Sequence, residues 1–147
     1  MNYSFNLFKS PQERNFFDYL TDDYLLERYL FPLELKPIVD LFSEDCNDSL
    51  CKVHIFNSRL FIEGGNGDER NELMLRFGDS RLRVARVEFI HKRIGNMDRL
   101  YELLKDIQRI YELKPIELEV CETESIRNWC NKHQFVELMN NNFVEKV

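Results

Sequence analysis

A short basic loop with one glycine joins a strand-like run to a strongly periodic helix in the stretch FIHKRIGNMDRLYELL, from Phe89 to Leu104. The first turn of a helix leaves backbone N–H groups without partners, and the helix dipole adds positive charge, so this position suits a phosphate or pyrophosphate. Gly95 would let the backbone approach such a ligand closely, and Lys92 and Arg93 would add positive charge at the rim. An ordinary turn from strand to helix with solvated basic side chains explains the same residues, and both interpretations stay open.

Composition narrows the class of ligand. The chain has 147 residues, 44% of them hydrophobic, enough to bury one core, so we expect a single domain over residues 1–147. The net charge is −6, and residues 1–50 carry it, with four Lys and Arg against ten Asp and Glu. A nucleic-acid backbone would be repelled by this balance, and we therefore expect no nucleic-acid partner. A small anionic ligand needs only a few N–H groups and cations, and remains compatible.

The start of the chain, MNYSFNLFKSPQERN, lacks the charged and then apolar run of a signal peptide, and apolar runs are short throughout. We therefore expect a cytoplasmic protein that does not bind a membrane. Four cysteines show no paired CxxC spacing and are expected to be reduced thiols. CNDSLC alone lacks further ligands nearby, so no metal site is predicted.

The first half of the chain predicts a strand, helices and then a meander. NYSFNLF alternates as a first strand, and Ser10, Pro11 and Glu13 form a capping box that begins a helix. LELKPIVDLF predicts a further short helix bent or started at Pro37. The runs CKVHIF, RLFIE, ELMLRF and RLRVARVEFI are strand-like and are separated by NS, GGNGD and GDS, which are turn signals. An antiparallel meander fits them, with GGNGD as a hairpin tip.

The second half alternates helices and strands. An apolar stripe from Leu100 to Tyr111 predicts a helix over residues 98–111, and IELEV predicts a strand over 116–120. Thr123 or Ser125 would cap a second helix, and the tail predicts a last strand or hairpin. A crossover of this length favours parallel pairing of residues 84–91 with 116–120. The predicted fold class is α/β (α+β), a layered domain with a mixed, mostly antiparallel twisted sheet flanked by helices.

Residues 84–136 resemble the GNAT superfamily of acyl-CoA N-acyltransferases. Members carry a central strand, a loop of pattern Q/R-x-x-G-x-G/A, a helix, a strand, and a helix that ends in a segment like lYeklGF. Here the corresponding segments are RVEFI, KRIGNM, DRLYELLKDIQRIYEL, IELEV and WCNKHQF. The order of the preceding elements agrees in outline, so the resemblance implies a GNAT-like domain for the whole chain.

The motifs depart from the family pattern at several positions. In the loop, Lys92 stands at the Gln/Arg position, Gly95 at the first glycine and Met97 at the second glycine or alanine. In the terminal segment, Cys130 stands where the family often has a general-acid tyrosine, and Gln134 replaces the glycine before phenylalanine. Thr123 aligns with the asparagine that often precedes this helix.

The resemblance implies a role for each part of the site. The backbone N–H groups near Phe89 and Ile90 would face the thioester carbonyl, and Glu88 would accept the amine proton directly or through water, with His91 as a second candidate. Cys130 would protonate the departing thiolate, or else is a small buried core residue. The loop that would bind the pyrophosphate comprises Arg93, Ile94, Gly95, Asn96 and Met97.

The resulting functional prediction is an acyl-CoA-dependent N-acyltransferase, with acetyl-CoA as co-substrate, acting on an unidentified primary amine by direct transfer. Its partner would be an amine-bearing small molecule or protein, with a homodimer as a further possibility. Acidic residues Asp18, Asp22, Asp23 and Glu27 would attract a basic acceptor, or form an ordinary hydrated face. Two alternatives stay open: a catalytically inactive GNAT-like binding or regulatory protein, and a small interaction protein that uses its aromatic and acidic N-terminal helices.

Overall fold

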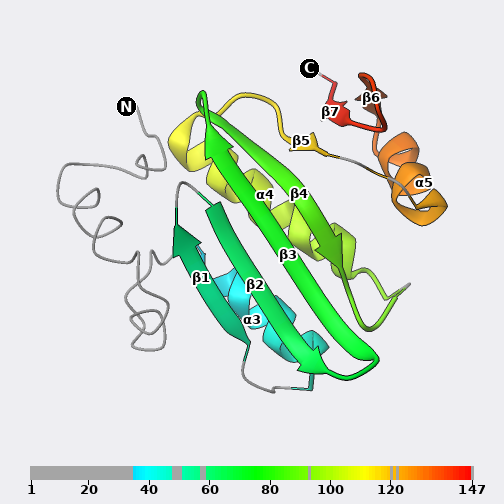
Figure 1. Ribbon diagram of the computed structural model, residues 1–147. Coiled ribbons are helices and arrows are strands. Elements are labelled where there is room, and N and C mark those ends of the chain that lie inside the picture. The colour runs from blue at the N-terminus through cyan, green and yellow to red at the C-terminus, as the bar shows by residue number, and fades with distance from the viewer. Residues whose placement is uncertain are drawn as a thin grey trace, which may run out of the picture.

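The computed structural model describes residues 35–47, 51–56, 59–92, 94–119, 121 and 123–146. The predicted first strand and the helix that begins at Ser10 lie outside these residues. Within the described residues the fold is mixed α/β, with three helices and one mostly antiparallel sheet of seven strands (Figure 1). The helices are α3 (Lys36–Asp45), α4 (Asn96–Tyr111) and α5 (Glu124–Lys132). The strands are β1 (Lys52–Phe56), β2 (Arg59–Asn66), β3 (Glu69–Gly78), β4 (Arg81–Glu88), β5 (Glu117–Leu118), β6 (Phe135–Glu137) and β7 (Phe143–Glu145).

Helix α3 confirms the short helix predicted around Pro37. Its proline lies in the first turn, where a missing N–H costs nothing. Its buried side chains are Ile38, Leu41, Phe42 and Asp45, which recur at the spacing of one helix face. The last member of that stripe is a carboxylate, and its partners belong to the candidate site.

Strands β1 to β4 form the predicted antiparallel meander. The predicted hairpin tip is confirmed, but the turn is shorter than GGNGD, because β2 and β3 pair as far as Asn66 and Glu69. Gly64 therefore lies inside β2. A Cβ at this position would stand 2.5 Å from Asn71 Oδ1 and 2.9 Å from Cys46 Sγ, so the strand needs glycine here for a close approach.

The parallel pairing predicted after the meander is confirmed, with Val84 of β4 opposite Leu118 of β5. This ladder is short, because β5 has only two residues. Its last hydrogen bond runs from the Glu119 N–H to the Val84 carbonyl at 2.8 Å. The register of β4 against β3 also shifts by one residue between Val84 and Arg86, as in a β-bulge. β4 then continues to Glu88 without β5 beside it, so the two strands diverge.

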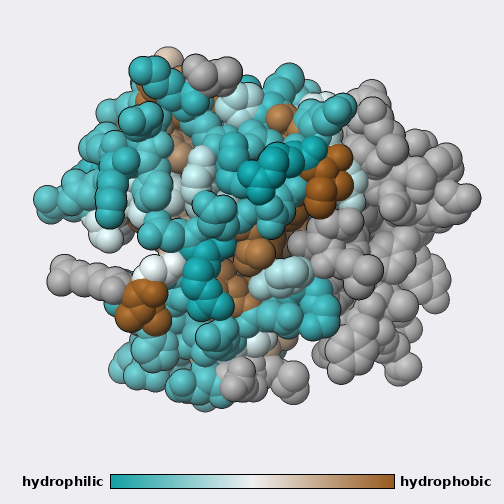
Figure 2. Space-filling model, turned by 180° about the vertical axis from the view of Figure 1, so that it is seen from behind, coloured by the Kyte–Doolittle hydropathy of each residue, from teal (hydrophilic) through white to brown (hydrophobic). Residues whose placement is uncertain are grey.

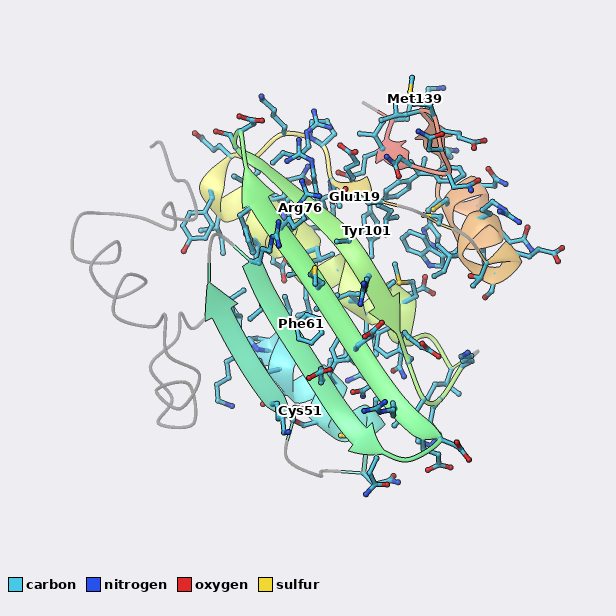
Figure 3. The ribbon with its side chains drawn as sticks, in the orientation of Figure 1. Cys51, Phe61, Arg76, Tyr101, Glu119 and Met139 are labelled. Carbon is cyan, nitrogen blue, oxygen red and sulfur yellow. The ribbon has the colours of Figure 1, made fainter. Side chains whose placement is uncertain are left out.

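The tail forms the predicted hairpin, β6–β7, and completes the sheet order β1-β2-β3-β4-β5-β7-β6. Strand β7 pairs antiparallel with β5, and its Glu145 N–H donates to the Ile116 carbonyl at 2.9 Å. The hairpin exposes three apolar side chains near its tip, where Met139 projects from the sheet (Figure 3). They are Val136, Leu138 and Met139.

Helices α3 and α4 lie together on one face of the sheet, and the main core fills the space between (Figure 1). On the opposite face Arg76 of β3 pairs with Glu119 at 2.9 Å (Figure 3). Arg81 and Arg83 of β4 pair with Glu117. The two glutamates after β4 are thus partners of arginines on neighbouring strands. No helix among the described residues is long and apolar enough to cross a membrane.

Candidate functional site

The divergence of β4 from β5 coincides with a groove of about 540 Å³. One wall is the end of β4, from Val87 to Phe89; the other is α5 between Thr123 and Lys132; residues 91, 92 and 95–98 complete it. The space-filling view from behind shows a notch at the left edge of the molecule, the side on which α5 lies (Figure 2). A groove of this size, partly apolar and with a few polar groups, is typical of a small-molecule site.

The first turn of α4 faces this groove, and its N-cap residue, Gly95, supplies no side-chain cap. Its N-cap is Gly95, whose φ of 83° lies in the left-handed region that favours glycine. A Cβ built on Gly95 would have no atom within 4 Å, so the space in front of it is open. Helix α5 differs, because Thr123 Oγ1 accepts the Ile126 N–H at 3.3 Å. The uncapped turn therefore leaves backbone N–H groups for an anionic ligand.

The buried carboxylate of Asp45 holds the segment between β4 and α4. Its Oδ2 accepts the Ile90 N–H at 2.7 Å, and its Oδ1 accepts the His91 N–H at 2.9 Å. The amide nitrogens of Asn71 and Asn96 donate to it at 2.9 Å and 3.2 Å. A single side chain of α3 thus fixes both the end of β4 and the first residue of α4.

Burial by itself would raise the pKa of Asp45, because it disfavours the charged form. The hydrogen bond from Asn71, those from the backbone of His91 and Ile90, and the contact with the His91 side chain outweigh it, so the pKa lies below its ordinary value. Asp45 is therefore a carboxylate at neutral pH, and a negative charge lies directly behind the loop.

The α5 wall is aromatic and is tied to α4. The Trp129 indole N–H donates to Asp98 Oδ1 at 2.8 Å, and its ring stacks on that of His133 with centroids 4.1 Å apart. His133 Nε2 also approaches Asp98 Oδ1, at 3.0 Å. Tyr101 of α4 meets Trp129 edge to face at 5.3 Å. This packing fixes the width of the groove where its wall is most apolar.

Charges of both signs line the groove. Glu88 and Asp98 supply carboxylates, while Lys92 and Lys132 supply ammonium groups. Lys92 lies 3.9 Å from Glu88, and both side chains are mostly exposed. The described part of the groove can therefore accept a ligand that carries both anionic and cationic groups.

The structure brings most of the predicted residues together. Glu88, Phe89, Gly95, Asn96 and Met97 all line the groove. The Phe89 ring is buried and stacks on Phe42 at 4.7 Å, and Met97 also packs against the core without filling the groove.

Two of the predicted residues that the structure describes, Ile90 and Ile94, do not line the groove. The Ile90 N–H, predicted to face a thioester carbonyl, donates to Asp45 instead and does not face the groove. Ile94 is 65% exposed and lies outside the groove lining. Arg93 lies outside the described residues.

Cys130 is also outside the groove, with no exposed surface. Its thiol hydrogen-bonds with Cys121, and this bond together with burial raises the pKa of Cys130 far above its ordinary value. The corresponding bond lowers the pKa of Cys121. A thiol held in this way cannot reach a leaving group in the groove, so the structure favours the interpretation of Cys130 as a small buried core residue.

A second, smaller cavity of about 300 Å³ shares Glu88 with the groove. Across the sheet, Glu63 of β2 lies opposite Glu72 of β3, which lies opposite Glu88 of β4. Lys52 of β1 completes this row opposite Glu63. Like charges directly opposite each other destabilise a sheet, and the row lowers the electrostatic potential beside the groove.

Sequence reasoning missed two groups: Asp45, and the Trp129–Asp98 link that fixes the α5 wall. The signal for Asp45 was present, since it falls seven residues after Ile38 on the buried stripe of α3. Trp129 carried no such signal, because its indole partner lies 31 residues away in the chain.

Comparisons with protein families, with characterised proteins and with solved structures find nothing that matches this chain. The assignment of a function therefore depends on the groove and its residues.

Proposed function

We propose that this protein is an acyl-CoA-dependent N-acyltransferase, with acetyl-CoA as co-substrate, that transfers an acyl group directly to a primary amine. The observation that carries the proposal is the groove between the diverging end of β4 and α5, with the uncapped first turn of α4 at Gly95 on its wall. The N–H groups of that turn would bind the pyrophosphate, and the apolar wall of Ile126 and Trp129 would contact the pantetheine arm. The order from β4 to β7 agrees with the resemblance to the GNAT superfamily.

The reaction needs a group that accepts a proton as the neutral amine attacks the thioester carbonyl. Two side chains of the groove meet this requirement, Glu88 at the end of β4 and His91 three residues later. The row of Glu63, Glu72 and Glu88 supports an acceptor that carries further positive charge. The acceptor class that follows is a cationic amine such as a polyamine or a lysine side chain.

A second candidate function is binding of an acyl-CoA without transfer. The burial of Cys130 favours it, since the residue at the position of the family's general acid cannot reach the groove. Binding and turnover must therefore be measured separately.

The proposal is tested by calorimetric titration of the purified chain with acetyl-CoA and with coenzyme A, at two temperatures so that a vanishing enthalpy cannot hide binding. Micromolar affinity is expected. Gly95→Asp places a carboxylate in the open space before the first turn of α4, and should weaken binding at least tenfold, about 1.4 kcal/mol. Aspartate is among the residues that best tolerate the left-handed conformation.

The matched control is Gly67→Asp, because Gly67 also has positive φ and a Cβ added there would have no atom within 4 Å, but it lies at the β2–β3 turn. The affinity of this variant for acetyl-CoA should equal that of the parent chain. Absence of binding by a sample whose circular dichroism shows it folded would refute the proposal. Equal weakening by both substitutions would also refute the placement of the phosphates at α4.

A further inference from the structure

Asp45 and His91 are joined at two points. The His91 backbone N–H donates to Asp45 Oδ1 at 2.9 Å. The His91 ring Nδ1 lies 2.9 Å from the Asp45 backbone carbonyl and 3.2 Å from Oδ1. Two attachments to one residue fix both the backbone and the orientation of the imidazole.

The partners of Nδ1 decide where the ring carries its proton. Both atoms that face Nδ1 are acceptors, a carbonyl oxygen and a carboxylate oxygen, so Nδ1 must be the N–H donor. In the neutral imidazole the remaining nitrogen, Nε2, is then the basic one. It lies on the side of the ring away from Nδ1 and from Asp45.

Asp45 is buried and His91 is exposed, as expected when a buried carboxylate orients a base that must reach a ligand. The Asp45 side chain is 0% exposed, whereas the His91 side chain is 46% exposed and lines the groove. The other charged groups that line the groove are Glu88 and Lys92 near the end of β4, Asp98 on α4 and Lys132 on α5. None of these four is buried, so their charges are partly screened by solvent, while the charge of Asp45 acts on the ring from the protein interior.

We propose that His91 Nε2 is the general base of this groove and that Asp45 is the residue that positions it. This inference rests on the proposed acyltransferase function and assigns its proton acceptor. The amine nitrogen attacks the thioester carbonyl carbon, forming the C–N bond, and the C–S bond breaks. The amine proton passes to Nε2 and then to the departing coenzyme A thiolate, so the products are the amide and the free thiol.

His91 fits this role better than Glu88. A general base works best when it exchanges protons near the working pH, and histidine is the side chain that does so near neutrality. Glu88 is 58% exposed and its carboxylate lies 3.9 Å from Lys92, whereas the His91 ring is held by the buried Asp45. Glu88 instead contributes charge to the acidic row beside the groove.

The first arm of the test needs no acyl transfer. Nitrogen-15 NMR of the histidine rings in the full chain should show neutral His91 with its proton on Nδ1. Asp45→Asn removes the carboxylate but keeps the backbone carbonyl at 2.9 Å, so it should lower the share of this tautomer without abolishing it. Asp40→Asn is the matched control, since Asp40 lies exposed on the same helix in a pair with Lys36. A neutral His91 with its proton on Nε2 in the parent chain would overturn the proposal even if Asp45→Asn fails to fold.

The second arm measures turnover with acetyl-CoA and spermidine as a cationic probe amine, following coenzyme A by chromatography because the chain has its own thiols. His91→Asn keeps a donor near the Nδ1 position but lacks Nε2, and kcat should fall by about 100-fold or more, with KM for acetyl-CoA nearly unchanged. The fall of kcat at low pH, where a general base becomes protonated, should disappear in that variant. Loss of kcat in Glu88→Gln, with His91→Asn still active, would overturn the assignment. If the parent chain neither binds nor consumes acetyl-CoA, the acyltransferase function fails, while the NMR arm still decides whether Asp45 fixes the ring.

Discussion

The Asp45 carboxylate accepts the Ile90 backbone N–H at 2.7 Å, joining the last turn of α3 to the end of β4 across 45 residues of sequence. This bond decides which N–H groups remain for a ligand. The groups of Ile90 and His91 face Asp45, whereas Gly95 at the start of α4 supplies no side-chain cap. A buried side chain outside the groove therefore selects the part of the loop that can bind an anion.

The first prediction is that stability in acid depends on Asp45. Its pKa is lowered in the folded state, so its contribution is fully present above the ordinary carboxyl range, at about pH 4, and is lost as pH falls through the lowered value. Urea unfolding between pH 7 and pH 2 should therefore show a shallower acid limb in Asp45→Asn. The variant should also lose about 1–3 kcal/mol at pH 7, because buried donors lose their acceptor.

Asp40→Asn should leave the acid limb unchanged, because Asp40 is exposed on the same helix. Glu145 also has a lowered pKa, so part of the limb should persist in Asp45→Asn. Parallel pH curves for Asp45→Asn and the parent chain would contradict the role given to Asp45.

A second prediction concerns the close approach at Gly64. An alanine Cβ would lie 2.5 Å from Asn71 Oδ1 and 2.9 Å from the Sγ atoms of both Cys46 and Cys51, so neighbours must move. Gly64→Ala should lower the free energy of unfolding by about 1–3 kcal/mol in a denaturant titration. Gly78→Ala is the control, because Gly78 ends β3 and a Cβ added there would have no atom within 4 Å; its effect should stay within about 0.5 kcal/mol. Equal effects of the two substitutions would show that the thiols do not constrain β2.

Local pattern predicted much of the fold. Alternation of apolar residues gave the strands of the meander, and the length of the connection after β4 favoured the parallel pairing with β5. The apolar stripe of α4 was correct except at Ile110, which is 58% exposed. These features depend on residues that are close in the sequence, so the spacing of apolar residues is enough to predict them.

The candidate site was predicted less completely, because its decisive contacts join distant segments. Pattern reading treats a buried helix position as apolar, and so passed over Asp45 on the stripe of α3. Whether Cys130 faced the groove or the core depended on the packing of Cys121 against it, which spacing does not reveal. The glycine-rich run looked like a turn, although Gly64 lies in β2 and is required by the close approach of Asn71 Oδ1 and two thiols.

A third prediction separates Cys130 from catalysis. Since the thiol is buried and outside the groove, Cys130→Ala should lower the free energy of unfolding by roughly 1 kcal/mol, through lost packing. In the acetyl-CoA assay, kcat for spermidine should stay within about twofold of the parent value at a temperature where both proteins are folded. A 100-fold fall in kcat without loss of stability would instead make Cys130 the general acid.

The last prediction concerns the anchor of the C-terminal hairpin. The buried carboxylate of Glu145 on β7 accepts hydrogen bonds from the Tyr101 hydroxyl, from Lys105 Nζ at 3.0 Å and from the Ile116 N–H at 2.8 Å. Gln108 Nε2 donates at 3.0 Å to Oε1, the oxygen that also accepts the Ile116 N–H, while Tyr101 and Lys105 donate to Oε2. Three donors from α4 and one from Ile116, directly before β5, thus meet on one side chain, near the edge of the sheet.

Glu145→Gln removes the charge and turns an amide donor toward these groups, so we expect a loss of about 1–3 kcal/mol in the free energy of unfolding. In the parent chain the amides of β6 and β7 should exchange with deuterium faster than those of β2 and β3, because β6 and β7 have only three residues each. In Glu145→Gln the exchange of the hairpin amides should be faster still. The control is Glu137→Gln on β6, whose side chain is exposed. If the hairpin amides of Glu145→Gln exchange as slowly as those of the control, the hairpin is held by its apolar contacts, chiefly Phe135 and Phe143, and not by the carboxylate.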